Sequence, residues 1–151
     1  MSHLSVGPVH HMRIAVTDVG RSQAFYTEVL GFEVAVAAPP PAGEEHHEVL
    51  VDSLQGGVIL MHQGMFFGLR PVDDERAAAA DRFDPFRVGL DHLSFTVPTR
   101  ADLDAAASLL DDRGVEHGPI RDLEPLGLSF LAFFDPDGIA LELTAPISDP
   151  V

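Results

Sequence analysis

Two stretches of the chain alternate apolar and polar residues with the period of two that is typical of a half-buried β-strand. The first is HMRIAV, residues 11–16, and the second is HLSFTV, residues 92–97. Each begins with a histidine, and the apolar residues at every second position after it define a buried face. The opposite faces then carry the polar residues His11, Arg13, His92 and Ser94. Since neighbouring strand residues point to opposite faces, His10 is expected to lie on the other face from His11.

Each of these strands runs into a predicted amphipathic helix. Asp18 is a suitable N-cap for the first helix, and Thr99 with Asp102 three residues later has the form of a capping box. The apolar residues that follow recur at spacings of three and four, and each helix is expected to end near a glycine, Gly31 or Gly114. The chain is therefore expected to repeat a strand-helix unit.

Three further strands are expected in each half. In the first half we predict them at residues 32–38, 47–54 and 57–63, and in the second half at residues 115–118, 126–134 and 138–146. The last two are joined by the turn DPDG, residues 135–138. The prediction is an α+β protein made of two tandem βαβββ modules, residues 8–63 and 89–146, with a connecting segment over residues 64–88 that contains a short helix near ERAAAADRF.

The composition narrows the chemistry that these modules can carry. The chain of 151 residues has no cysteine, and all its basic residues are arginines. Thiolate metal sites, thiol nucleophiles and Schiff-base lysines are thereby excluded. The formal net charge of −15 disfavours binding to nucleic acid or to anionic membranes. No segment has the length and hydropathy of a membrane span or a signal peptide, so we expect a cytoplasmic protein.

The duplicated plan, the histidine that opens each half and the DPDG turn followed by Glu142 resemble the vicinal oxygen chelate superfamily. The segments FDPFRVGLDHLSFTVP and FFDPDGIALELTAP carry the likeness most clearly. This group includes glyoxalase I, extradiol dioxygenases, methylmalonyl-CoA epimerase, fosfomycin-resistance enzymes and bleomycin-binding proteins. The resemblance implies a glyoxalase-like fold, in which the two modules form a curved mixed sheet around a central cavity.

The resemblance also implies a metal site. Matched position by position, the metal ligands are His11, His92 and Glu142. Two histidines and one carboxylate suit a single divalent ion of Fe, Mn, Zn, Ni or Co and leave coordination positions open for a substrate. The implied function is a divalent-metal-dependent lyase or isomerase of glyoxalase type, which acts on a small substrate chelated through vicinal oxygens.

One expected ligand is missing, and this keeps alternatives open. Relatives that resemble glyoxalase I have a fourth ligand on the last strand of the first module, which we predict at residues 57–63. The matching position there is Leu60 or Met61, and neither residue is a hard-metal ligand. His62 or Gln63 remains a candidate fourth ligand or general base.

Two other functions fit parts of the pattern. An extradiol ring-cleaving dioxygenase would use the same three ligands, although Phe134 stands where those enzymes resemble one another in a tyrosine. A non-catalytic protein that binds a cationic antibiotic of bleomycin type would suit the acidic chain. For substrate contacts we predict Arg13, Phe66, Phe67 and Ser94, and we expect a homodimer.

Overall fold

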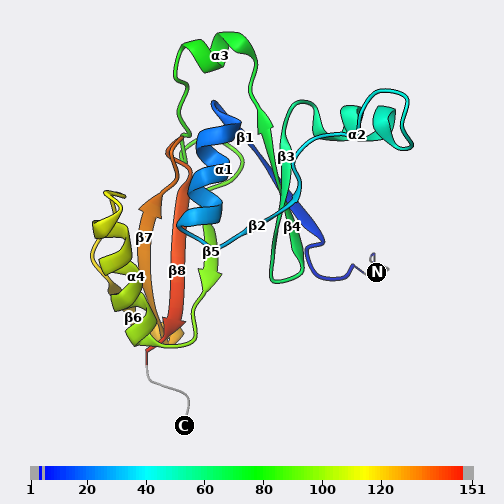
Figure 1. Ribbon diagram of the computed structural model, residues 1–151. Coiled ribbons are helices and arrows are strands. Elements are labelled where there is room, and N and C mark those ends of the chain that lie inside the picture. Colours follow the sequence, from blue (N-terminus) through cyan, green and yellow to red (C-terminus); the bar gives the residue numbers. More distant parts are fainter. Residues whose placement is uncertain (1–3, 5, 148–151) are drawn as a thin grey trace. The chain divides into compact units, whose positions relative to one another are not determined.

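The computed structural model describes residues 4 and 6–147 and divides into two compact units, with the boundary along the chain between Asp81 and Arg82. Each unit contains one mixed four-stranded sheet, and each sheet is accompanied by its own helix (Figure 1). The predicted α+β class and the two βαβββ arrangements are confirmed. The boundary between the units falls inside the segment 64–88 that was expected to connect them.

The first unit is built around the sheet β1-β4-β3-β2. Its elements are β1 (His11–Val16), α1 (Val19–Glu28), β2 (Glu33–Val36), α2 (His47–Leu54), β3 (Val58–His62), β4 (Met65–Pro71) and α3 (Asp74–Ala78). Strand β4 lies parallel to β1 and antiparallel to β3. The first and last strands of the unit are therefore hydrogen-bonded neighbours, with β1 at one edge of the sheet, and their paired side chains share a surface.

Helix α1 contacts one face of this sheet through β4 and β3. Its N-cap is Asp18, as predicted, whose carboxylate accepts a hydrogen bond from the Arg21 backbone N–H at 2.9 Å. Tyr26 of α1 is fully buried and packs on Phe67 of β4, with 4.9 Å between the ring centroids. The apolar face of β1 joins this core through Ile14 and Val16.

The second unit repeats the plan with the sheet β5-β8-β7-β6. Its elements are β5 (Leu93–Thr96), α4 (Arg100–Asp112), β6 (Arg121–Leu123), the short 3-10 helix η1 (Glu124–Leu126), β7 (Leu128–Phe134) and β8 (Ala140–Pro146). Strand β8 is parallel to β5 and antiparallel to β7. In the turn before β8, the Asp135 carboxylate accepts hydrogen bonds from the backbone N–H groups of Asp137 and Ile139.

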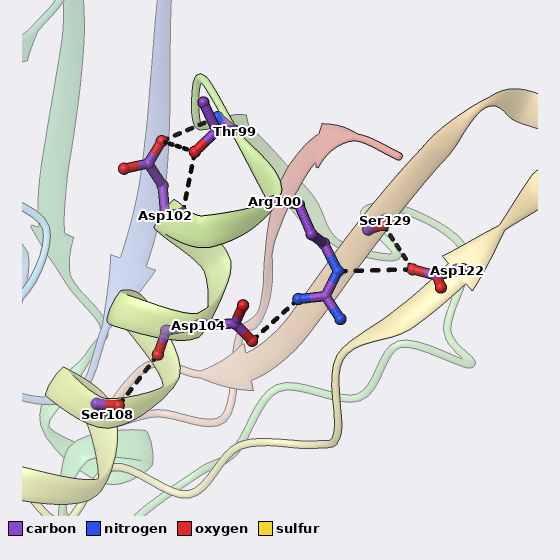
Figure 2. A network of polar contacts seen from close by, with 7 residues as sticks. All are labelled: Thr99, Arg100, Asp102, Asp104, Ser108, Asp122 and Ser129. Carbon is purple, nitrogen blue, oxygen red and sulfur yellow. Dashed lines mark hydrogen bonds and ion pairs between the residues drawn. The ribbon is translucent and has the colours of Figure 1, made fainter. Parts of the chain in front are cut away.

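Polar contacts hold α4 on this sheet (Figure 2). The predicted capping box is present, because Thr99 and Asp102 each bond the other's backbone N–H. Arg100, the first residue of α4, pairs with Asp104 on its own helix at 3.0 Å and with Asp122 of β6 at 3.7 Å. Asp122 also accepts a hydrogen bond at 2.6 Å from Ser129 of β7, whose side chain is fully buried. The N-terminal turn of α4 is thus linked to two strands of the sheet.

The strand predicted at residues 47–54 is wrong, because this segment forms the helix α2. Its alternating valines suggested a strand, yet Leu54 alone among its residues is buried, and Val49 and Val51 are exposed. The place in the sheet expected for a third strand is filled instead by β4, within residues 64–88. A two-residue turn at Gln63 and Gly64, both with positive φ, joins β3 to β4.

In the second unit, the strand predicted at residues 115–118 is reduced to one bridge between His117 and Phe133. Regular pairing with β7 begins later, in β6. Over the described part of the chain, the longest helices are too short or too polar to cross a bilayer.

Candidate functional site

The two faces of β1 have different surroundings, as the alternation predicts. Ile14 and Val16 are buried under α1, whereas His11, Arg13 and Ala15 are exposed on the opposite face. Paired residues of neighbouring strands share a face, and the register joins His11 to Phe66 and Arg13 to Gly68. We name this surface of the first unit the open face; it carries His11, Arg13, Ile59, Phe66, Gly68 and Arg70.

A cavity of about 270 Å³ lies on the open face. It is lined by residues 10–13, Ser53 of α2, Ile59 of β3, and Phe66 and Gly68 of β4. The expectation that His10 points away from His11 is wrong. His10 precedes β1, so strand alternation does not govern it, and its Nδ1 lies 3.0 Å from the Nδ1 of His11. One of these two nitrogens donates a hydrogen bond to the other.

Arg13 crosses the open face above a glycine. A Cβ atom built on Gly68 would lie 2.9 Å from Cγ of Arg13, so the absence of a side chain at residue 68 makes room for the arginine stem. The Arg13 guanidinium then reaches α2, where Nη2 donates a hydrogen bond to the Leu54 carbonyl at 2.7 Å. Arg13 therefore links β1 to the last turn of the helix that borders the cavity.

The other predicted site residues of the first unit are divided between its faces. Phe66 is on the open face, but Phe67 is fully buried in the core beside Tyr26. His62 is in register with Met65 and stacks on Phe32 at 4.5 Å between ring centroids, so it lies on the face covered by α1. Gln63 occupies the exposed turn after β3. Neither His62 nor Gln63 lines the cavity.

A second cavity, of about 500 Å³, adjoins Arg70 near the end of β4 and is bordered by Gln55, Asp73 and Arg76. Asp73 caps α3 and pairs with Arg76. The Arg76 backbone N–H, and to a lesser degree its guanidinium, holds the pKa of the Asp73 carboxyl below its ordinary value of 3.8. The negative charge of Asp73 and the positive charge of Arg76 therefore largely neutralise each other at the border of this cavity.

In the second unit, two predicted site residues, Ser94 and Glu142, lie side by side on the β5–β8 pair, and His92 directly precedes β5. Ser94 is in register with Glu142, and its hydroxyl donates a hydrogen bond to the Glu142 carboxylate at 3.0 Å. His92 lies two residues before Ser94, and its Nδ1 bonds the Asp91 carboxylate at 2.5 Å. The neighbours of Glu142 along β8, Leu141 and Leu143, are buried on the opposite face, as predicted.

Glu142 is half-buried, and its recorded partner within the described residues is the neutral hydroxyl of Ser94. A carboxylate that is partly removed from water is stabilised by a cation or by several hydrogen-bond donors. Its environment therefore leaves oxygen atoms available for a cation. Among residues 4 and 6–147, however, no three His, Asp or Glu side chains are gathered as a metal-binding cluster.

The register also identifies the counterpart of Glu142 in the first unit. Glu142 pairs with Ser94, the second residue after His92, and Gly68 pairs with Arg13, the second residue after His11. The fourth-ligand position was expected at Leu60 or Met61, on the assumption that β3 was the last strand. This expectation is wrong, because β4 is the last strand and the equivalent residue is Gly68. A glycine offers no side-chain ligand at this position.

The chain belongs to the superfamily whose profile matches its residues 9–143, described as the Glyoxalase/Bleomycin resistance protein/Dioxygenase superfamily. The predicted resemblance is therefore confirmed. As this description states, the superfamily unites enzymes with a resistance protein, so membership by itself does not define an activity.

Similar proteins support the same assignment. The uncharacterized protein YwkD of Bacillus subtilis is 36% identical over 136 residues, which cover 89% of this chain and 94% of YwkD. The uncharacterized protein YaeR of Escherichia coli is 34% identical over 143 residues, 93% of this chain and 97% of YaeR. A solved glyoxylase/bleomycin resistance protein/dioxygenase domain from Frankia sp. EAN1pec is 30% identical with a TM-score of 0.72, covering 94% of this chain and 99% of that domain.

The fosfomycin resistance protein FosX of Listeria monocytogenes agrees in fold, with a TM-score of 0.67 at 18% identity over 95% of this chain and 93% of its own.

Several residues around the cavity were missed by sequence reasoning. Ser53 was assigned to a strand, and Ile59 and Gly68 are residue types without obvious chemistry. The available signal was the Gln63-Gly64 pair between two apolar runs, which is compatible with a two-residue hairpin. A hairpin there would have placed Gly68 opposite Ile59, whereas the pairing of Gly68 with Arg13 depends on the long-range contact between β1 and β4.

Proposed function

We propose that this protein is a divalent-metal-dependent enzyme that binds a small substrate through vicinal oxygens and catalyses a lyase or isomerase reaction. The proposed metal ligands are His11 from the first unit and His92 and Glu142 from the second. The observation that carries the proposal is the half-buried Glu142 carboxylate, whose recorded partner within the described residues is one hydroxyl group. A divalent cation would balance its charge.

The donor set suits such an ion. Two imidazoles and a carboxylate bind Fe, Mn, Zn, Ni or Co, and three protein ligands leave positions open for substrate oxygens. Metal-binding histidines commonly donate their second ring N–H to a carboxylate, which fixes the ring. The contact between His92 Nδ1 and Asp91 has this form and leaves Nε2 for the metal.

When bound, the metal would act as a Lewis acid toward a carbonyl or enolate oxygen. The residues of the chain would orient the groups around it. Ser94 holds one oxygen of the Glu142 carboxylate through a hydrogen bond, and Asp91 fixes the His92 ring. Because Gly68 supplies no ligand, the proposed site differs from a four-ligand site at one position. We also propose a homodimer with no nucleic-acid partner, in keeping with the charge of −15.

Elemental analysis of the protein purified without added metal tests the proposal. We expect about one equivalent of a divalent metal, and we expect its loss in the His92→Ala and His11→Ala variants. His46→Asn is the matched control, because His46 is exposed in a loop with positive φ, a conformation that asparagine tolerates. A metal-free wild-type protein that also fails to bind Mn²⁺, Zn²⁺ or Ni²⁺ would contradict the proposal.

Two further measurements separate the other functions of the superfamily. Oxygen consumption with catechol and Fe²⁺ would indicate a ring-cleaving dioxygenase that uses the same three ligands. Tight bleomycin binding by the chelator-treated protein, unaffected by His92→Ala, would indicate a binding protein in place of an enzyme.

A further inference from the structure

The cavity on the open face combines an apolar wall with one cationic group. Ile59 and Phe66 border it, and both share a face with Arg13. Its volume of about 270 Å³ exceeds the ~150 Å³ that holds a benzene molecule in an engineered protein cavity. A phenyl ring with a short side chain therefore has a suitable size for this space.

The charge of Arg13 is not neutralised by a carboxylate in the described part of the chain. The protein has 24 acidic residues and 9 arginines, so an arginine readily finds an acidic partner. Arg76 pairs with Asp73, and Arg100 pairs with Asp104 and Asp122. Arg13 instead donates to the neutral Leu54 carbonyl, which uses one of the five N–H donors of a guanidinium. The remaining donors can bind an external acceptor.

The Gly68 position directs this arginine. With a side chain at residue 68, the stem of Arg13 would have to shift, because the Cβ would lie 2.9 Å from its Cγ. With glycine, the stem lies across β4, and the guanidinium is held at the α2 end by Leu54. An anchored guanidinium is a preorganised partner for a carboxylate, which it can bind through two parallel hydrogen bonds.

We propose that this cavity binds a compact apolar carboxylate, with its ring or branched alkyl group against Ile59 and Phe66 and its carboxylate on Arg13. The identification of this acid as the substrate rests on the proposed function. The binding itself needs no metal, so it is testable separately. Arg13 is then the residue that selects an acid over an uncharged molecule of the same shape.

Calorimetric titration of the chelator-treated full-length protein tests this proposal, with phenylacetate as the probe. Phenylacetamide has the same shape without the charge, and acetate has the charge without the ring. We expect phenylacetate to bind about 10- to 100-fold more tightly than phenylacetamide, as is typical of a hydrogen bond to a charged group. We expect acetate to bind more weakly than phenylacetate, because it buries no apolar surface.

Variants locate the site. Arg13→Gln is expected to remove the preference for the acid, and Arg13→Lys to restore part of it, since lysine keeps the charge without the planar fork. Gly68→Ala is expected to weaken phenylacetate binding while the arginine remains. Arg121→Gln in β6 is the matched control, because it removes one exposed arginine from the second unit and should leave binding unchanged.

Equal affinity for the acid and the amide in the wild-type protein would overturn the proposal, and this comparison needs no variant to fold. Unchanged phenylacetate affinity in a folded Arg13→Gln variant would also overturn it. If phenylacetate fails to bind but Mn²⁺ still does, this inference fails and the proposed function stands. If phenylacetate binds but no divalent metal does, the proposed function fails and the carboxylate site stands.

Discussion

The two units share a topology but carry opposite charges on their equivalent strand pairs, on the first strand in one unit and on the last strand in the other. On the parallel pair β1–β4, Arg13 lies beside Gly68; on the parallel pair β5–β8, Ser94 lies beside Glu142. The backbone frame is the same, with the first and last strands of each unit side by side. The difference is one of side-chain volume and charge: a glycine in the first unit makes room for a long cation, and a hydroxyl in the second orients a carboxylate. In the functions proposed above, the first unit contributes Arg13 to the binding of a carboxylate, and the second contributes Glu142 to the binding of a metal ion.

The largest expected effect is on the affinity for a divalent metal ion when the charge of Glu142 in the second unit is removed, compared with removal of the charge of Arg13 in the first. Glu142→Gln is expected to lower the affinity for Mn²⁺ by more than about 100-fold, the upper end of what loss of an outer-shell partner costs. Arg13→Gln should not lower it, because Arg13 is not a proposed ligand. Isothermal titration of chelator-treated protein measures both. Equal losses in the two variants would mean that the units do not divide these roles, and Glu116→Gln, at an exposed loop position, is the control.

The buried serines of the two units give the next comparison. Ser129 in the second unit is fully buried and donates to Asp122, whereas Ser22 in the first is fully buried and has no hydrogen-bond partner for its hydroxyl among the described residues. Ser129→Ala is expected to lower the free energy of unfolding by about 1–2 kcal/mol. Ser22→Ala should be neutral or slightly stabilising, since it removes an unsatisfied polar group. Urea denaturation measures both, and a destabilisation of similar size in Ser22→Ala would show that its hydroxyl has a partner after all.

The N-caps of α4 and α1 are expected to differ by a smaller amount in their contribution to the free energy of unfolding. Thr99→Ala removes a reciprocal capping box at α4, and Asp18→Ala removes a single side-chain cap at α1. We expect Thr99→Ala to cost about 1 kcal/mol, and Asp18→Ala somewhat less, because one N–H loses its acceptor there. Thermal unfolding followed by circular dichroism gives the order. Thr96→Ala, at an exposed position of β5, serves as the control, and the reverse order for the two caps would contradict the comparison.

The smallest effect concerns α3, a helix of the first unit without a counterpart in the second. The pKa of Asp73 is below 3.8 in the folded protein, chiefly because the Arg76 backbone N–H donates to its carboxylate. Its contribution to stability is therefore present above the unfolded pKa and is lost as the pH falls through the folded value. Amide hydrogen exchange at Arg76, corrected for its intrinsic pH dependence, should show less protection below pH 3.8. Asp73→Asn should lose this pH dependence, whereas Asp74→Asn should retain it.

Much of this architecture followed from short-range patterns. The alternation in residues 11–16 and 92–97 fixed the two faces of β1 and β5, because a strand has no other way to bury every second residue. The caps Asp18 and Thr99 marked the starts of α1 and α4 through local hydrogen bonds. The failures occurred where the pattern was ambiguous: the segment 47–54 alternates like a strand but is a helix with one buried residue, and β4 follows a turn with a weak hairpin signal.

The sequence by itself determined the duplicated α+β plan, the family, and the placement of His11 and Glu142 on strand faces opposite their apolar neighbours. Only the tertiary structure decided that β4 is the partner of β1, that Gly68 is the equivalent of Glu142, and that His10 and Ser53 border the same cavity as Arg13. The physical reason is that periodicity records which side of an element is buried, whereas the neighbour of each strand depends on long-range pairing. That pairing places Gly68 beside Arg13, 55 residues away in the chain (68 − 13). Because Gly68 has no side chain, the stem of Arg13 can lie across β4 at this position.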